Sequence, residues 1–200
     1  MRSCRLLLPL VLLAAPAAAQ SATGWTLTLG LEGQRFATAA EDTVTAGGAA
    51  VSLRPSGRIG GRLGLQRQVG SWGVGVTLGW AAGEVEAYNE AVAIRDRTAD
   101  LSRYRVGLAL ERRVATVGTG ALALAVSPGL DLWTVEGNTR TRAGAEASAA
   151  LRLQVGRFQV EQRLAFGLSG SPVEQSDVGE GFDLHALRTL VFGVGVRLSL

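Results

Sequence analysis

The chain has 200 residues, 20 arginines and no lysine against 17 acidic residues, and one cysteine, Cys4. Without Arg2 and Arg5, which lie in a predicted export signal, the balance is 18 basic to 17 acidic residues, a net charge of about +1, so the basic pI does not indicate nucleic-acid binding. With no cysteine beyond Cys4, a disulfide scaffold and a thiolate metal site are excluded, and about 180 remaining residues suit one domain.

The amino terminus has the pattern of a secretory signal. Arg2 and Arg5 precede an apolar stretch over residues 6 to 15, and the small residues 17 to 19 follow. The stretch is much shorter than the roughly 20 apolar residues of a spanning helix. We therefore predict a cleaved signal peptide over residues 1–19 and a mature domain over residues 20–200.

The rest of the chain alternates with a period of two, which predicts strands. In the clearest case Trp72, Val74, Val76, Leu78 and Trp80 share one face, and small residues occupy the other. Each segment is long enough to cross a membrane as a tilted strand of roughly 9 to 11 residues. Eight strands are expected, at residues 24 to 37, 50 to 69, 72 to 84, 101 to 114, 119 to 133, 143 to 155, 158 to 169 and 186 to 200.

The connections are expected to alternate in length. Long polar loops follow strands one, three, five and seven, and short turns follow strands two, four and six. Two of the turns, Gly70-Ser71 and Gly156-Arg157, begin with a glycine that can adopt a positive φ. We therefore expect Val69 to pair with Trp72 and Val155 with Phe158.

The two faces of the strands decide between a membrane barrel and a soluble one. Large charged residues among many glycines and alanines suit a narrow polar interior, which leaves the apolar face toward lipid. Pairing Val155 with Phe158 also predicts an ion pair between Arg152 and Glu161. The charged residues predicted for the lumen are seven arginines and four glutamates, an excess of about three positive charges. The full set of predicted lumenal residues is Glu32, Gln34, Arg58, Arg62, Gln66, Thr77, Arg103, Arg105, Glu111, Glu146, Arg152, Gln154, Gln159, Glu161, Arg163 and Arg197.

Aromatic residues near the strand ends are expected to form two interfacial girdles. Two residues do not fit the pattern. Gln162 falls on the lipid-facing side, and Trp133 falls on the lumenal side unless Pro128-Gly129 introduces a bulge. The predicted girdle residues are Trp25, Phe36, Trp72, Trp80, Tyr104 and Phe158.

The carboxyl terminus alternates up to its last residue, with Gly195, Leu198 and Leu200 matching the terminal signature of bacterial outer-membrane barrels. The usual signature ends in an aromatic residue and has a polar residue where this chain has Gly193. With its strand count and loop asymmetry, the chain resembles the small eight-stranded barrels of the OmpA membrane domain, OmpX and OmpW class. The resemblance implies an all-β, eight-stranded antiparallel up-and-down transmembrane β-barrel in the outer membrane. It also implies contact with outer-membrane lipid and lipopolysaccharide, and assembly through the carboxyl-terminal strand by the barrel assembly machinery.

The loops offer weaker chemical hints. Residues 84 to 102 carry five acids against two arginines, and the segment 170 to 185 is also acidic, which would suit divalent cations or a basic partner. No calcium-loop spacing is present, and no cofactor is predicted. An enzyme that modifies lipid A would use His185 as its base, with Asp183 and one of Ser169, Ser171 and Ser176. The His-x-Ser pattern of a lipid A deacylase is absent.

The expected function is therefore that of an integral outer-membrane barrel with a polar, largely plugged lumen and acidic outer loops, in a structural or surface-interaction role and not as an enzyme. A narrow small-solute channel of the OmpW kind is the nearest alternative. The others are the lipid A-modifying enzyme and a soluble, lipocalin-like periplasmic binder, in which the stripe from Trp72 to Trp80 would line a cavity.

Overall fold

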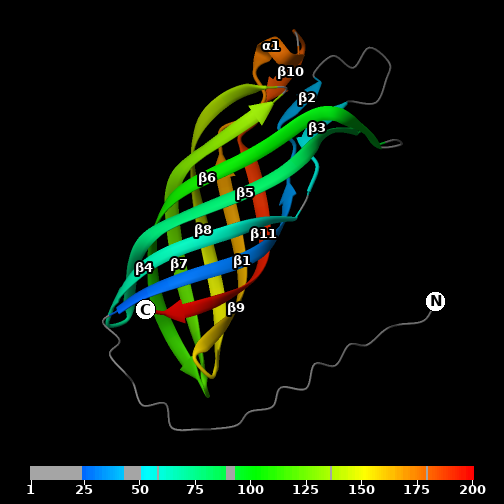
Figure 1. Cartoon of the computed structure of the whole chain (residues 1–200). Coiled ribbons are helices and arrows are strands. Elements are labelled where there is room, and N and C mark those ends of the chain that lie inside the picture. Colours follow the sequence, from blue (N-terminus) through cyan, green and yellow to red (C-terminus); the bar gives the residue numbers. More distant parts are fainter. Residues whose placement is uncertain (1–23, 43–50, 58, 89–92, 136, 179) are drawn as a thin grey trace, which may run out of the picture.

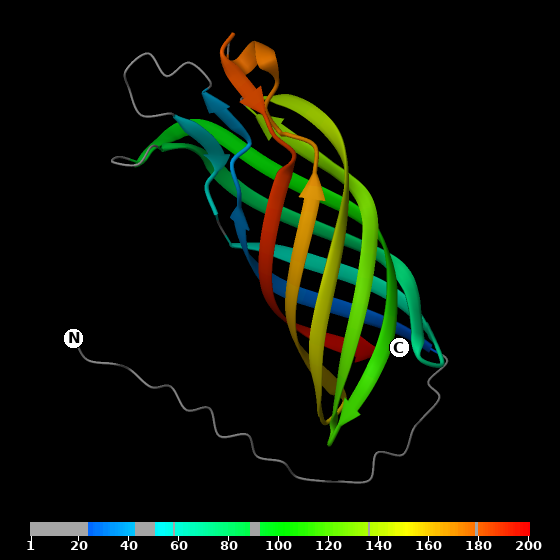
Figure 2. The same cartoon turned by 180° about the vertical axis from the view of Figure 1, so that it is seen from behind.

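The computed structural model describes residues 24–42, 51–57, 59–88, 93–135, 137–178 and 180–200. Eight long antiparallel strands form a closed barrel, because β1 pairs with both β4 and β11 and the β5–β6 pairing completes the ring (Figures 1 and 2). In the described part of the chain no helix has the length and apolar character needed to cross a membrane. The barrel strands are β1 Gly24–Phe36, β4 Ile59–Val69, β5 Trp72–Tyr88, β6 Ala93–Val117, β7 Gly120–Val135, β8 Asn138–Val155, β9 Phe158–Ser169 and β11 Leu187–Ser199.

Four short elements gather at one end of the barrel, which we call the loop end (Figure 1). The opposite end, the turn end, holds the short turns and Leu200. At the loop end the sheet continues from β5 through β3 and β2 to β10, and so forms a ledge beside the mouth. These elements are β2 Ala40–Asp42, β3 Ser52–Pro55, α1 Gln175–Val178 and β10 Phe182–Leu184.

The turn end is built from two-residue turns that begin with glycine. Gly70 and Gly156 have φ values of 62° and 59°, a region that glycine enters without steric cost. The predicted pairings of Val69 with Trp72 and of Val155 with Phe158 are confirmed. A third turn of the same length, at Gly118-Thr119, joins β6 to β7.

Several predicted boundaries are wrong at the loop end. The predicted strand at residues 50 to 69 divides into β3 and β4, and the pairing with β5 shifts by one residue between Pro55 and Gly60. Pro55 has no N–H to donate and Gly57 lies against Gln34 O, so an irregular segment is favoured there. The expected loops at residues 85 to 100 and 134 to 142 are instead mostly strand, because hairpin pairing continues beyond the barrel mouth.

The faces alternate as a barrel requires. On β9, Glu161 and Arg163 are buried inside, and Leu164 and Phe166 are exposed outside. Gln162 does face outward, between Leu151 of β8 and Val194 of β11.

Trp133 faces the lumen because the β7–β8 register runs without interruption from Gly120 to Val135, so there is no bulge at Pro128-Gly129. The irregularity lies instead in β6, between Arg113 and Ala115. The girdle assignment of Phe36 is wrong. Its side chain is only 6% exposed and packs edge-on against Trp133, with ring centroids 5.7 Å apart. Phe36 lies two residues after Gln34 and four after Glu32 on β1, so the alternation of the strand turns its side chain toward the lumen, as it does theirs.

Small residues on β5 allow neighbouring strands to approach closely, and two glycine-to-alanine substitutions test this packing. A Cβ at Gly75 would overlap Leu65 O and lie 2.6 Å from Gln66 Cα, whereas a Cβ at Gly79 has its nearest contact at 3.7 Å, with Arg105 Cβ. We expect Gly75→Ala to lower the free energy of unfolding by about 1–3 kcal/mol, because backbone must shift, and Gly79→Ala to leave it nearly unchanged. Urea unfolding in lipid vesicles measures both, and equal effects would contradict this packing.

Candidate functional site

The interior of the barrel holds three layers of charged side chains, and the first lies nearest the turn end. Arg152 Nε donates to Glu161 Oε2 at 2.8 Å, and its terminal nitrogens donate to both oxygens of Glu111. Arg197 donates to Glu161 at 3.1 Å, to Glu111 at 3.3 Å and to Gln66 at 3.0 Å. Arg62 Nη1 also donates to Glu161, at 3.2 Å. Five strands are thereby connected across the lumen.

The second layer is centred on Arg163. Its guanidinium donates to Glu32 Oε1 at 2.6 Å and also bonds Glu146, so one cation joins β1, β8 and β9. Arg62, Glu161 and Arg163 line a cavity of only about 10 Å³ between this layer and the first. That volume is at the lower limit for holding a single water molecule. The two layers are therefore in nearly continuous contact.

The third layer, nearer the loop end, is built around Asp131, which is 0% exposed. Its carboxylate accepts from Arg103 Nε at 3.0 Å and from Arg105 Nη1 at 3.0 and 3.1 Å. Arg105 also donates to Ser127 O at 2.8 Å, and Arg103 donates to Gln34 at 3.2 Å. One carboxylate thus serves two guanidinium groups that are both buried.

An apolar cap closes the loop end above this layer. The guanidinium of Arg103 lies 5.4 Å from the ring centroid of Trp133 and 5.9 Å from that of Phe36, within range of cation–π attraction. Val173, from the connection after β9, packs on the same cluster from outside. The buried members of the cap are Phe36, Ala39, Leu101, Trp133, Val135 and Leu187.

The structure brings the predicted lumenal residues together, with three qualifications. Arg58 lies outside the described residues, and Gln154 and Gln159 lie at the rim of the turn end, where Gln154 Nε2 donates to Gly156 O. Sequence reasoning also missed Asp131, although it lies two residues before Trp133 and so shares its face. Asp131 adds a fifth carboxylate and so lowers the predicted excess of positive charge by one. Among the described lumenal groups, which do not include Arg58, six arginines face five carboxylates.

A second set of ion pairs ties the segment after β9 to β8 at the loop end. Arg140 donates to both oxygens of Asp177 and to Pro172 O. Arg142 donates to Ser171 O and to Glu174, and both of these Arg142 bonds measure 2.7 Å. Two of the acidic loop residues are therefore partnered by arginine. No group of three or more histidine, cysteine or acidic side chains suited to a metal ion occurs in the described ranges.

The hydrogen bonds from Arg140 hold the pKa of Asp177 below its ordinary value. Because the folded-state pKa is the lower one, this stabilisation is complete above the ordinary value of about 3.9 and disappears as the pH falls through the folded value. We expect residues 171 to 178 to exchange amide hydrogens faster at about pH 3 than at neutral pH, beyond the intrinsic pH effect. Hydrogen exchange measures this, and Asp177→Asn is expected to abolish the difference. A difference that persists in that variant would assign it to another group.

His185 and the candidate serines do not converge in the described structure. His185 Nε2 lies 3.7 Å from Glu41 Oε2 at an exposed position, and Asp183 is exposed on β10. Ser169 Oγ bonds Gly170 O, and Ser171 Oγ bonds Ala39 O. In the described residues no hydrogen bond joins His185 to a serine hydroxyl, so the arrangement of nucleophile and base is not formed here.

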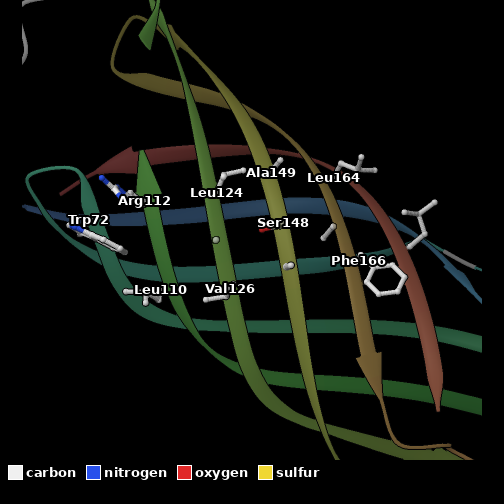
Figure 3. A pocket seen from close by; sticks show the side chains of 13 residues that line it. Trp72, Leu110, Arg112, Leu124, Val126, Ser148, Ala149, Leu164 and Phe166 are labelled. Atoms are coloured by element: carbon white, nitrogen blue, oxygen red, sulfur yellow. The ribbon is translucent and has the colours of Figure 1, made fainter. Parts of the chain in front are cut away.

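The outward face is apolar. The stripe that would line the cavity of a soluble barrel lies outside, with Trp72 43% and Trp80 45% exposed, which contradicts the alternative of a lipocalin-like binder. A groove of about 610 Å³ lies on this face. Within it, Ala149 of β8 lies between Leu124 of β7 and Leu164 of β9 (Figure 3). Arg112 stacks over Trp72 at one end of the groove, 5.2 Å from the ring centroid.

Comparisons with known proteins agree with this architecture. The family model described as outer membrane protein beta-barrel domain matches residues 6–198. The solved structure of Neisserial surface protein A is similar, with a TM-score of 0.59 and 11% identity over 88% of this chain and 97% of that one. The outer membrane protein OprG of Pseudomonas aeruginosa also has a TM-score of 0.59, with 9% identity over 89% and 96% of the two chains. At these identities the likeness shows the fold alone. No curated protein sequence is matched.

Proposed function

Because the chain belongs to the outer membrane protein β-barrel domain family, we propose that it is a plugged, non-conducting barrel of the bacterial outer membrane with a structural and surface-interaction role. The observation that carries this proposal is the filled interior. Three layers of interlocked ion pairs lie beneath a buried aromatic cap, so water and solutes have little room to pass.

The asymmetry of the two ends supports a surface role. Outer-membrane barrels have short periplasmic turns and longer outer loops, and by this rule we infer that the loop end faces the cell exterior. There the ledge of β3, β2 and β10 and the arginine-tethered segment after β9 form a platform held by strand pairing and ion pairs. A platform held in this way can present a binding surface at a lower cost in conformational entropy than an untethered loop.

Assembly through the carboxyl-terminal strand is part of the proposal. β11 pairs with β1 from Thr189 to Ser199, and Leu198 and Leu200 share the outward parity of Val194 and Val196. Gly195 lies inward, where a Cβ would be 2.8 Å from Leu29 O. These features fit a strand that the barrel assembly machinery could recognise before the ring closes.

A catalytic role is not part of the proposal. In the described residues, His185 makes no hydrogen bond to a serine hydroxyl, and it lies at an exposed position beside Glu41. Both observations support a polar surface role for this residue.

The narrow channel of the OmpW kind is the competing function, and ion conduction separates the two. We expect the purified barrel, reconstituted in a planar bilayer, to give no current steps above those of the bare bilayer at either polarity. A porin in the same bilayer serves as the control for detection, and protease protection verifies insertion. Reproducible steps that scale with salt concentration would overturn the plugged barrel in favour of a conduit.

A further inference from the structure

Two arginines break the apolar outward face near the loop end. Arg35 of β1 and Arg188 of β11 both point outward and are exposed. Arg35 pairs directly with Leu190, two residues from Arg188, so the two side chains are diagonal neighbours on one face, at a Cβ separation of about 7 Å. In the described part of the chain neither guanidinium has an ion pair or a hydrogen bond.

Two unpaired arginines side by side on a membrane-facing surface are unfavourable by themselves. Like charges at this separation repel, and a lipid-facing arginine becomes costly as it approaches the hydrocarbon. In the lumen every arginine that we describe has a carboxylate partner, whereas here the neighbours on the membrane side are Leu190 and Phe192. An anion between the two guanidinium groups would remove the repulsion.

The site has a shape as well as a charge. A pocket of about 410 Å³ is lined by Arg35, Arg188 and Arg54, with Phe166 and Leu190 at its apolar side. The charge of Arg54 is already matched by Glu86, at 2.9 Å, and its guanidinium stacks on Tyr88 at 4.2 Å. The uncompensated charge in the pocket therefore belongs to Arg35 and Arg188.

An apolar groove of about 470 Å³ adjoins this pocket and shares Arg35 and Leu190 with it. Gly33 and Gly57 leave it open, and Ile59, Leu164 and Phe192 form its sides. A basic pocket that continues into an apolar groove on a membrane-facing surface matches a molecule with an anionic headgroup and acyl chains.

We propose that Arg35 and Arg188 bind a phosphate group of a lipopolysaccharide molecule in the outer leaflet, with one acyl chain in the adjoining groove. Guanidinium groups match phosphate geometry through paired hydrogen bonds. The proposal rests on the orientation argued under the proposed function but not on the plugged lumen. A conducting barrel would contradict the plug and leave this site unaffected.

Native mass spectrometry of the refolded barrel in detergent, with phosphorylated or dephosphorylated lipid A, tests the proposal. We expect phosphorylated lipid A to bind the native barrel, and binding to fall at least about tenfold in the double variant Arg35→Gln, Arg188→Gln, because charge-assisted contacts are lost. Dephosphorylated lipid A is expected to bind equally weakly to both proteins.

The matched control is Arg67→Gln with Arg157→Gln, which removes the same charge at the turn end, where both residues are exposed. Its lipid binding should equal that of the native barrel, and heat-modifiable gel migration confirms that each variant is folded. Equal binding by the first double variant, equal loss in the control, or indifference to the lipid phosphate would overturn the proposal. Displacement of the lipid by millimolar inorganic phosphate alone would make the pocket a free-anion site instead.

Discussion

Asp131→Asn is expected to lower the free energy of unfolding of the barrel by about 3–5 kcal/mol, because it leaves two buried guanidinium groups without their shared carboxylate. Asp131 is fully buried, and Arg103 and Arg105 are each less than a tenth exposed. Asparagine keeps the shape of the side chain but loses its charge, and its amide N–H groups would face other donors. Urea unfolding in lipid vesicles, followed by tryptophan fluorescence, measures the change.

Glu146→Gln is the control for this prediction. Glu146 bonds Arg163, but Arg163 keeps a second carboxylate, that of Glu32 at 2.6 Å. The loss should therefore be clearly smaller. A triple variant with apolar residues at 103, 105 and 131 should regain most of the stability, because a buried ion cluster and well-packed apolar residues of similar volume are often equivalent. A triple variant as unstable as Asp131→Asn would contradict the ion-pair account.

Trp133→Ala is expected to cost about 3–5 kcal/mol through the cavity it leaves in the apolar cap. Trp133 is 1% exposed and contacts Phe36 and Arg103. Its indole Nε1 has no hydrogen-bond partner in the described structure, so the loss comes from packing and from cation–π attraction. The same urea titration measures it, with fluorescence from the remaining tryptophans.

Trp80→Ala removes the same side chain from the outward face, near the same end of the barrel, and is the matched control. Trp80 is exposed and pairs with Tyr104 on the neighbouring strand. Lipid can occupy the space that it leaves, so the loss in stability should be smaller than for Trp133→Ala. Equal losses would mean that the cap is no better packed than the membrane-facing surface.

Local pattern was sufficient for most of the barrel. Alternation predicts which side each residue of a strand faces, and a two-residue turn beginning with glycine predicts the register, as at Val155 and Phe158. Two residues were nevertheless mispredicted, although the same alternation places both of them inside the barrel. Phe36 was assigned to the girdle by its place near a strand end, although its parity put it inside with Glu32. Asp131 was overlooked because it lies among apolar residues of β7.

The sequence by itself determined the class of fold, the number of barrel strands, the two faces and the register at two of the three tight turns, since period-two alternation and glycine turns are local properties. Only the tertiary structure decided which carboxylate meets which arginine and that strands continue past the barrel mouth. Ring closure brings residues such as Glu32 and Arg163 together from positions 131 apart in the chain. Partners across a lumen depend on strand stagger and on the length of each side chain, and no local pattern encodes either.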